Sequence, residues 1–115
     1  MAVYVDDYRI PWRGGEWSHL LADSTEELHA FAAGLRLPRR RFHHKPVRPW
    51  QDHYDLLERE REAAIRLGAR PISCAEAAAR LRAKRRALAE ADRELAAMPS
   101  VRPVRGSPPR GHGHY

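Results

Sequence analysis

The residues best suited to chemistry in this 115-residue chain are histidines and acids gathered in its first half. Five of the seven histidines lie there, close to an apolar run that ends in two adjacent acids. Imidazole and carboxylate groups bind divalent metals and serve as general acids and bases. The candidates for acid–base catalysis are Asp6, Asp7, His53 and Asp55, and the candidates for metal binding are Asp7, His19, His29 and His53.

These residues predict a catalytic metal centre assembled from separate elements. Such a centre commonly has three protein ligands and one position open to water, and zinc, manganese, magnesium or iron would serve as the metal. Metal-bound water would then attack a phosphoryl or acyl group. The sequence has no His-x-x-x-His pair on a helix and no cysteine cluster, so the spacing alone names no particular metal.

Each candidate also has a purely structural interpretation. Asp52 and Asp55 are suited to the first turn of a helix, where they would only cap it or interact with its dipole. His19 beside Trp17 would be a core histidine bonded to a backbone carbonyl, and His29 would be an exposed helix residue. Both interpretations remain open from the sequence.

The first elements must bring the early acids and His19 together. An apolar run predicts a strand at residues 2–5, and the prolines and glycines of residues 8–15 predict a loop. A second strand follows at 17–22, with alternate side chains on one face. A capping-box spacing and an apolar stripe predict a helix at 24–34.

A basic, proline-rich stretch occupies residues 37–50. It predicts an exposed loop with at most a short strand near Phe42, because proline cannot donate to a strand ladder. His43 and His44 lie in this stretch and are interpreted as solvated side chains.

Two further helices are predicted after this loop. Asp52 is interpreted as the N-cap of a helix that ends at Gly68, and residues 69–72 as a short edge strand. Ser73 begins a long third helix, through a second capping-box spacing, and this helix continues to Met98.

Together these elements predict one small α/β or α+β domain over residues 1–98, with two to three short strands and about three helices. Residues 99–115 contain four prolines, three glycines, three arginines and no acid, which predicts a disordered basic tail. The chain has no apolar run of membrane-spanning length and no signal peptide at its start, so a soluble cytoplasmic protein without membrane contact is expected.

The chain has a single cysteine, Cys74, and so no internal disulfide. It falls in the first turn of the predicted third helix, where the helix dipole would favour a thiolate. No histidine adjoins it in sequence, which argues against a nucleophilic role.

The net charge of +6 comes from the second half of the chain. Residues 1–55 carry eight basic and eight acidic residues, whereas residues 56–115 carry thirteen and seven. Arg82, Arg85 and Arg86 share one side of the third helix and are the candidate nucleic-acid ligands. A non-enzymatic module that binds nucleic acid or protein is therefore the alternative to a hydrolase, although a merely solvated helix face has the same composition.

The third helix also has leucines at heptad spacing, at positions 81, 88 and 95. A narrow apolar seam of this kind is typical of helix pairing, so a homodimer through Leu81, Leu88 and Leu95 is a further expectation.

Several motifs follow one another along the chain: Val3-Tyr4-Val5-Asp6-Asp7, Trp17-Ser18-His19, Glu27-Leu28-His29-Ala30-Phe31-Ala32, the region of Phe42, Asp52-His53-Tyr54-Asp55 and Gly68-Ala69. Together they resemble DUF4031, a family of small bacterial and phage-associated domains of unknown function. The resemblance covers about residues 2–85 and departs from the family pattern in a longer proline-rich stretch before Asp52 and in the extended third helix. It implies no catalytic role for any residue.

Overall fold

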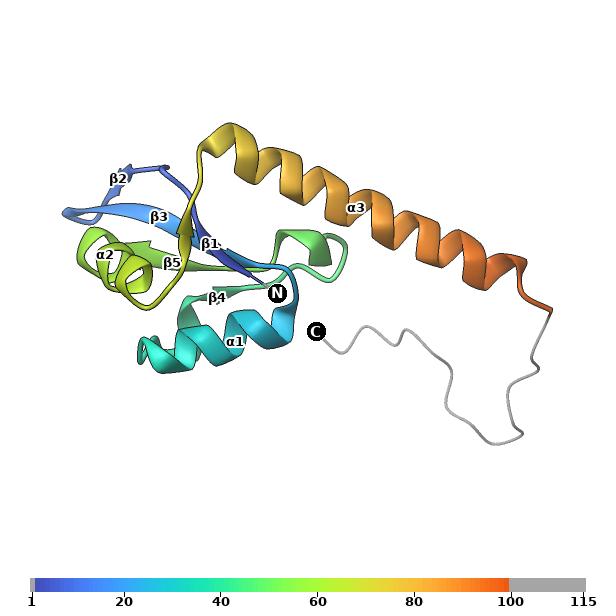
Figure 1. Ribbon diagram of the computed structural model, residues 1–115, viewed down its shortest axis with the longest axis horizontal. Helices are drawn as coiled ribbons and strands as arrows, with labels where there is room; N and C mark the ends of the chain where they lie inside the picture. The colour runs from blue at the N-terminus through green and yellow to red at the C-terminus, as the bar shows by residue number, and fades with distance from the viewer. Residues whose placement is uncertain (1, 100–115) are drawn as a thin grey trace.

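A mixed β-sheet lies at the centre of the computed structural model, which describes residues 2–99 (Figure 1). The described chain forms six strands, three α-helices and two short 3-10 turns, which confirms the predicted α+β class with more strands than expected. The strands are β1 (Val3–Val5), β2 (Ile10–Trp12), β3 (Gly15–Ala22), β4 (Phe42–His43), β5 (His53–Leu57) and β6 (Arg70–Pro71). The helices are α1 (Thr25–Gly34), α2 (Glu58–Arg66) and α3 (Cys74–Ala97), and the turns are η1 (Arg39–Arg41) and η2 (Pro49–Gln51).

The sheet has the strand order β4-β5-β3-β1-β6, and β2 extends it by pairing with β3. All pairs are antiparallel except β1 with β6, which the chain reaches through α2. The short β6 lies at the edge, as predicted, where Pro71 costs no ladder hydrogen bond.

The prediction of a loop at residues 8–15 is wrong, because these residues contain β2 and the turn of a β-hairpin. Arg13 and Gly14 both have positive φ, at 46° and 74°, which is typical of the two-residue turns that match strand twist. Within residues 2–99, β2 pairs with β3 alone, and an edge strand of this kind tolerates Pro11.

The first and third helices begin where their caps predict. Ser24 Oγ accepts a hydrogen bond of 3.2 Å from the backbone N–H of Glu27, and Ser73 Oγ accepts one of 3.1 Å from that of Glu76. Among the described residues, no helix has both the length and the apolar composition needed to cross a bilayer.

The second helix begins later than predicted, because residues 53–57 form strand β5. Their burial alternates with a period of two, so that Tyr54 and Leu56 are 1% and 0% exposed while their neighbours are only partly buried. Asp52 therefore caps no α-helix. Its carboxylate accepts a hydrogen bond of 3.0 Å from the Thr25 hydroxyl and lies 2.6 Å from Nδ1 of His44.

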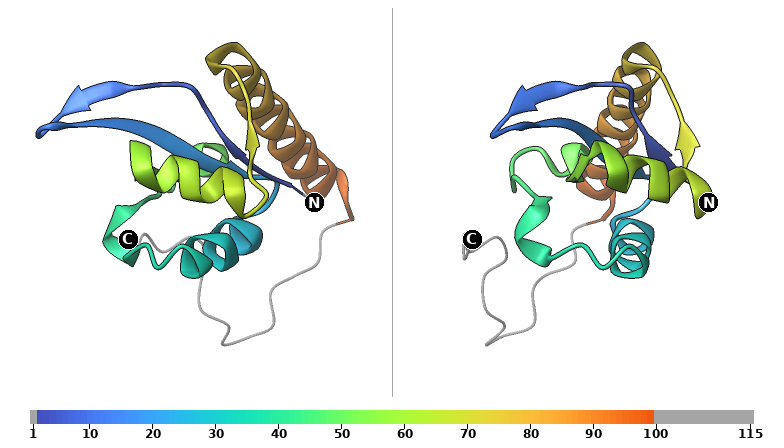
Figure 2. Two further views of the ribbon diagram at one scale, coloured as in Figure 1. Left: turned by 60° about the vertical axis from the view of Figure 1, so that its left-hand side comes forward. Right: turned by 90° about the vertical axis from the view of Figure 1, so that its left-hand side faces the viewer.

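The two faces of the sheet are covered differently (Figures 1 and 2). Helices α1 and α2 cover one face, where the larger hydrophobic core lies, and we call it the closed face. The inner end of α3 covers only part of the other, open face, and the rest of α3 extends past the sheet. The closed face carries Ser18, Leu20, Tyr54 and Leu56, and the open face carries Trp17, His19, His53 and Asp55.

The predicted division at residue 98 falls at the end of the described part of the chain. The tail expected at 99–115 lies, apart from Pro99, outside the described residues.

Candidate metal centre

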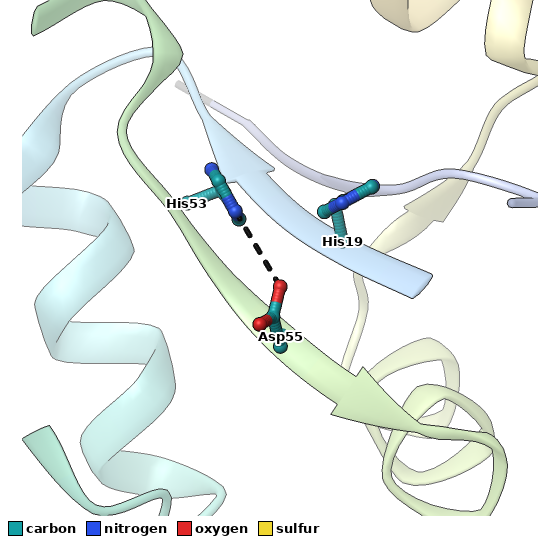
Figure 3. A group of neighbouring side chains, drawn as sticks. All are labelled: His19, His53 and Asp55. Atoms are coloured by element: carbon teal, nitrogen blue, oxygen red, sulfur yellow. Dashed lines mark ion pairs between the residues drawn. The ribbon is translucent and has the colours of Figure 1, made fainter. Parts of the chain in front are cut away.

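Three potential metal ligands converge on the open face of the sheet (Figure 3). His19 on β3 pairs directly with Asp55 on β5, and His53 lies two residues before Asp55 on the same strand. Directly paired and alternate residues share a face, so all three side chains point to one side. One ligand atom from each residue lies within 4.8 Å of the other two.

Asp6 fixes the ring of His19. Its Oδ2 lies 2.6 Å from His19 Nδ1, and its Oδ1 accepts a backbone hydrogen bond of 2.9 Å from His19. Asp6 is only 3% exposed, and buried Arg61 donates to its carbonyl at 2.9 Å. With Nδ1 held in this way, Nε2 of His19 remains available to a metal, as in carboxylate–histidine–metal arrangements.

The pKa of His19 is raised above its ordinary value. The hydrogen bond to Asp6 is the main cause, and it outweighs the opposing effect of burial, with a further contribution from Asp55. Metal binding at His19 therefore competes with a proton that the protein retains more strongly than usual.

His53 is oriented by the backbone rather than by a carboxylate. Its Nδ1 lies 2.7 Å from the carbonyl oxygen of Gln51, and because a carbonyl can only accept, Nδ1 carries the proton. In the neutral ring Nε2 then has the lone pair that a metal requires. This atom lies 3.4 Å from Oδ1 of Asp55, to which it can donate only when the ring is protonated.

Asp55 is surrounded by histidines. Its Oδ2 lies 2.7 Å from Nε2 of His43, whose ring stacks on that of His53 with centroids 5.0 Å apart. Burial acts to raise the pKa of Asp55, but the hydrogen bond from His53 and the charges of His43, His53 and His19 outweigh it, so the pKa is lowered. The carboxylate is therefore an anion near neutral pH, as metal binding requires.

His43 was missed as a site residue. The sequence interpretation placed it in a solvated loop, and its side chain is indeed 52% exposed, but β4 pairs it directly with His53. The short strand predicted near Phe42 is the one signal that points to this position. Arg61 gave no signal, since it lies in a helix rich in charged residues.

A small pocket of about 140 Å³ adjoins these residues, between the open face and the inner end of α3. It has room for a few waters or a small group of a larger ligand. Its lining consists of Asp6, His19, Leu21, Gln51, His53, Ala77 and Leu81.

Asp7 lies apart from the three ligands. Its Oδ1 accepts two hydrogen bonds of 2.9 Å from Cys74, one from the backbone N–H and one from Sγ. The side-chain bond to Asp7, with burial, raises the pKa of Cys74 to about 11. The expectation that the helix dipole would favour a thiolate is therefore wrong, because the adjacent carboxylate has the larger effect.

His29 also lies apart from the ligands, on the closed face. Its Nδ1 lies 2.7 Å from the hydroxyl of Tyr54, and its ring packs edge-on against Phe42 with centroids 4.5 Å apart. Burial, with the positive charge of Arg39, lowers its pKa. Of the predicted metal ligands, His19 and His53 come together, whereas Asp7 and His29 do not.

The basic positions of α3 are at the surface. Arg82, Arg85 and Arg86 are exposed, and the guanidinium of Arg85 lies 5.2 Å from the ring centre of Trp50. Leu81 packs against the smaller core of its own domain, while Leu88 and Leu95 are 41% and 59% exposed. One of the three leucines is therefore used inside the domain and two are exposed. The homodimer stays a prediction.

Comparison with protein families matches residues 3–84 to the model described as "Protein of unknown function (DUF4031)". This match confirms the resemblance seen in the sequence. No curated protein and no solved structure matches the chain.

Proposed function

Because the chain belongs to the DUF4031 family, whose description assigns no activity, we propose a function from the geometry of the site itself. The protein binds a divalent metal through His19, His53 and Asp55 and uses it to hydrolyse a phosphate ester or a nucleic acid. One observation carries the proposal: three ligand atoms lie within 4.8 Å of one another, and both imidazoles are held through Nδ1 by separate acceptors.

The donor set selects among metals. Two imidazoles and one carboxylate suit zinc, manganese or iron, whereas magnesium prefers oxygen ligands and retains its waters. Three protein ligands leave positions open for water and substrate. The bound ion would polarise a phosphoryl oxygen and lower the pKa of a bound water.

The surrounding residues have different roles in this proposal. His53 and Asp55 are ligands rather than acid–base catalysts, and Asp6 is a positioning residue for His19. His43 donates through Nε2 to Oδ2 of Asp55 at 2.7 Å, so it is a positioning residue for this ligand. Asp7 has no part, because its carboxylate is engaged by Cys74.

Metal content tests the site directly. We would measure it by mass spectrometry on the full, untagged chain carrying His112→Gln and His114→Gln, so that the last histidines bind no metal. About one ion per chain is expected, lost in His53→Ala and retained in the matched control His29→Ala. Equal content in the two variants, or no metal and no thermal stabilisation by zinc or manganese, would contradict the site.

Hydrolysis is tested separately from binding. A metal-loaded protein should cleave the phosphodiester bis(p-nitrophenyl) phosphate, and a chelator or His53→Ala should abolish the cleavage. A protein that binds metal but cleaves neither this compound nor an oligonucleotide would be no hydrolase of this class.

A second candidate function is a binding module based on α3. Among the described residues no carboxylate pairs with Arg82, Arg85 or Arg86, so these charges are available to phosphates. Under this alternative, Arg82→Ala with Arg86→Ala should weaken nucleic-acid binding and reduce its salt dependence. Substitutions at His53 should then have no effect on any activity.

A further inference from the structure

A strip of large side chains lies on the open face next to the proposed metal ligands. It consists of Tyr8, Ile10, Trp12 and Trp17, and we call it the aromatic strip. Tyr8, Ile10 and Trp12 are 49%, 41% and 56% exposed, although such side chains are normally buried in a small domain. An exposed cluster of this kind marks a binding surface.

The strip is continuous with the metal ligands. Ile10 pairs directly with Trp17 across the hairpin, and Trp17 shares its face with His19 two residues along β3. The ring of Tyr8 packs edge-on against His19 with centroids 5.7 Å apart. A ligand lying on the strip would therefore extend toward His19.

The strip is also held in place before any ligand binds. The rings of Trp12 and Trp17 meet edge-on with centroids 5.9 Å apart, and Nε1 of Trp17 donates a 2.9 Å hydrogen bond to the carbonyl of Trp12. The turn at Arg13 and Gly14 fixes the relative position of the two strands. Little conformational entropy would be lost on binding at this surface.

Arg13 lies next to the aromatic strip and has a charge available to a ligand. The guanidinium of Arg13 lies 4.5 Å from the ring centre of Trp12, and within residues 2–99 no carboxylate pairs with it. By contrast, Arg9 pairs with Glu58, and Arg41, which lies over Trp17, pairs with Glu60. Partly exposed aromatic side chains thus lie next to a cation at the outer end of the strip.

We propose that the aromatic strip binds single-stranded nucleic acid, with bases stacked on Trp12 and Tyr8 and a backbone phosphate at Arg13. Unpaired bases offer free faces for stacking, whereas those of a duplex are already stacked on one another. An uncharged sugar or an apolar peptide would gain no ionic attraction from Arg13. The inference rests on the proposed function in one respect only: the strand would lead a phosphodiester toward the metal at His19.

Binding is measured without metal, by fluorescence anisotropy of a labelled 12-nucleotide DNA or RNA strand on the full chain in a chelator. Trp12→Leu keeps an apolar side chain but removes the ring, and it should weaken binding about tenfold, the usual effect of one stacked base. Trp50→Leu makes the same change beside α3 and should alter binding less than twofold. Equal losses in both variants, or a loss only at Trp50, would overturn the proposal in favour of the α3 surface.

The charge is tested with substitutions matched in backbone conformation. Arg13 and Arg36 both have positive φ, at 46° and 58°, a conformation that asparagine tolerates. Arg13→Asn should lower the dependence of log Kd on log salt by about 0.7, as expected for one phosphate contact on a single strand, while Arg36→Asn should leave it unchanged. Equal effects of the two would show only general attraction and would contradict a site on the strip.

The remaining outcomes separate this inference from the metal proposal. Single-strand binding in the chelator that is weakened in Trp12→Leu but not in Trp50→Leu supports the strip even if no metal site exists. A protein that binds metal but binds a 12-base-pair duplex, or a neutral oligosaccharide, as tightly as the single strand would overturn the strip and leave the metal site standing.

Discussion

The two faces of the sheet show how the same two strands can serve stability on one side and chemistry on the other. On the closed face, Leu20 and Leu56 are 0% exposed beneath α1 and α2. On the open face, the neighbouring positions His19 and Asp55 are polar and lie beside a small pocket. Because side chains alternate along a strand, packing on one side leaves the other side free for function.

The two histidines that contact these faces illustrate the difference. His19 on the open face has a carboxylate partner, and its pKa is raised. His29 on the closed face has a neutral partner, the hydroxyl of Tyr54, and its pKa is lowered mainly by burial. The partner and the degree of desolvation, rather than the residue type, determine which histidine holds a proton more tightly.

The largest expected effect is on stability, and it should differ between the two faces of the sheet. Leu56→Ala, on the closed face, should lower the free energy of unfolding by about 3 kcal/mol, because it leaves a cavity in the core. Leu57→Ala, one residue later and only partly buried on the open face, should cost less than about 1.5 kcal/mol. Urea unfolding of the chain measures both, and equal losses would mean that the open face is packed as tightly as the closed one.

A smaller effect concerns the positioning of His19. Asp6→Asn keeps the size of the side chain, but its amide would donate to Nδ1 and force the ring proton onto Nε2, the atom proposed to bind metal. Metal affinity should fall by about 10- to 100-fold. Isothermal titration with zinc measures it, and the matched control Asp23→Asn, which removes a carboxylate away from the ligands, should have no effect. An unchanged affinity in Asp6→Asn would show that His19 needs no such support.

The smallest effect is a pair of opposite pH dependences, measured in a chelator. The raised pKa of His19 means that its contribution to stability is present below about pH 6.5 and is lost as the pH rises through the folded-state pKa. The lowered pKa of His29 means that its contribution is present above about pH 6.5 and is lost as the pH falls through its folded-state value. The measured quantity is the difference in free energy of unfolding between the wild type and each of the variants His19→Gln and His29→Gln. The two differences should therefore change in opposite directions with pH. A common direction would mean that the two faces do not differ electrostatically.

Local signals account for the parts of the fold that were predicted. The capping residues Ser24 and Ser73 lie at the starts of α1 and α3, and the strand containing Pro71 lies at the sheet edge. Capping and proline effects act within a few residues, so they can be read directly from the order of side chains. The prediction of Asp52 as an N-cap was wrong. Aspartate is a common capping residue, but the burial of the residues that follow it alternates with the period of a strand.

The amino-acid sequence by itself determined which residues were available to the site: acids after the first strand and histidines scattered through the first half. Only the tertiary structure decided which of them meet. The antiparallel register that pairs His19 with Asp55 brings distant residues together, and β4 adds His43 by pairing with β5. Register depends on packing of the whole closed face, since a slip of one residue would turn His53 and Asp55 into the core and expose Leu56.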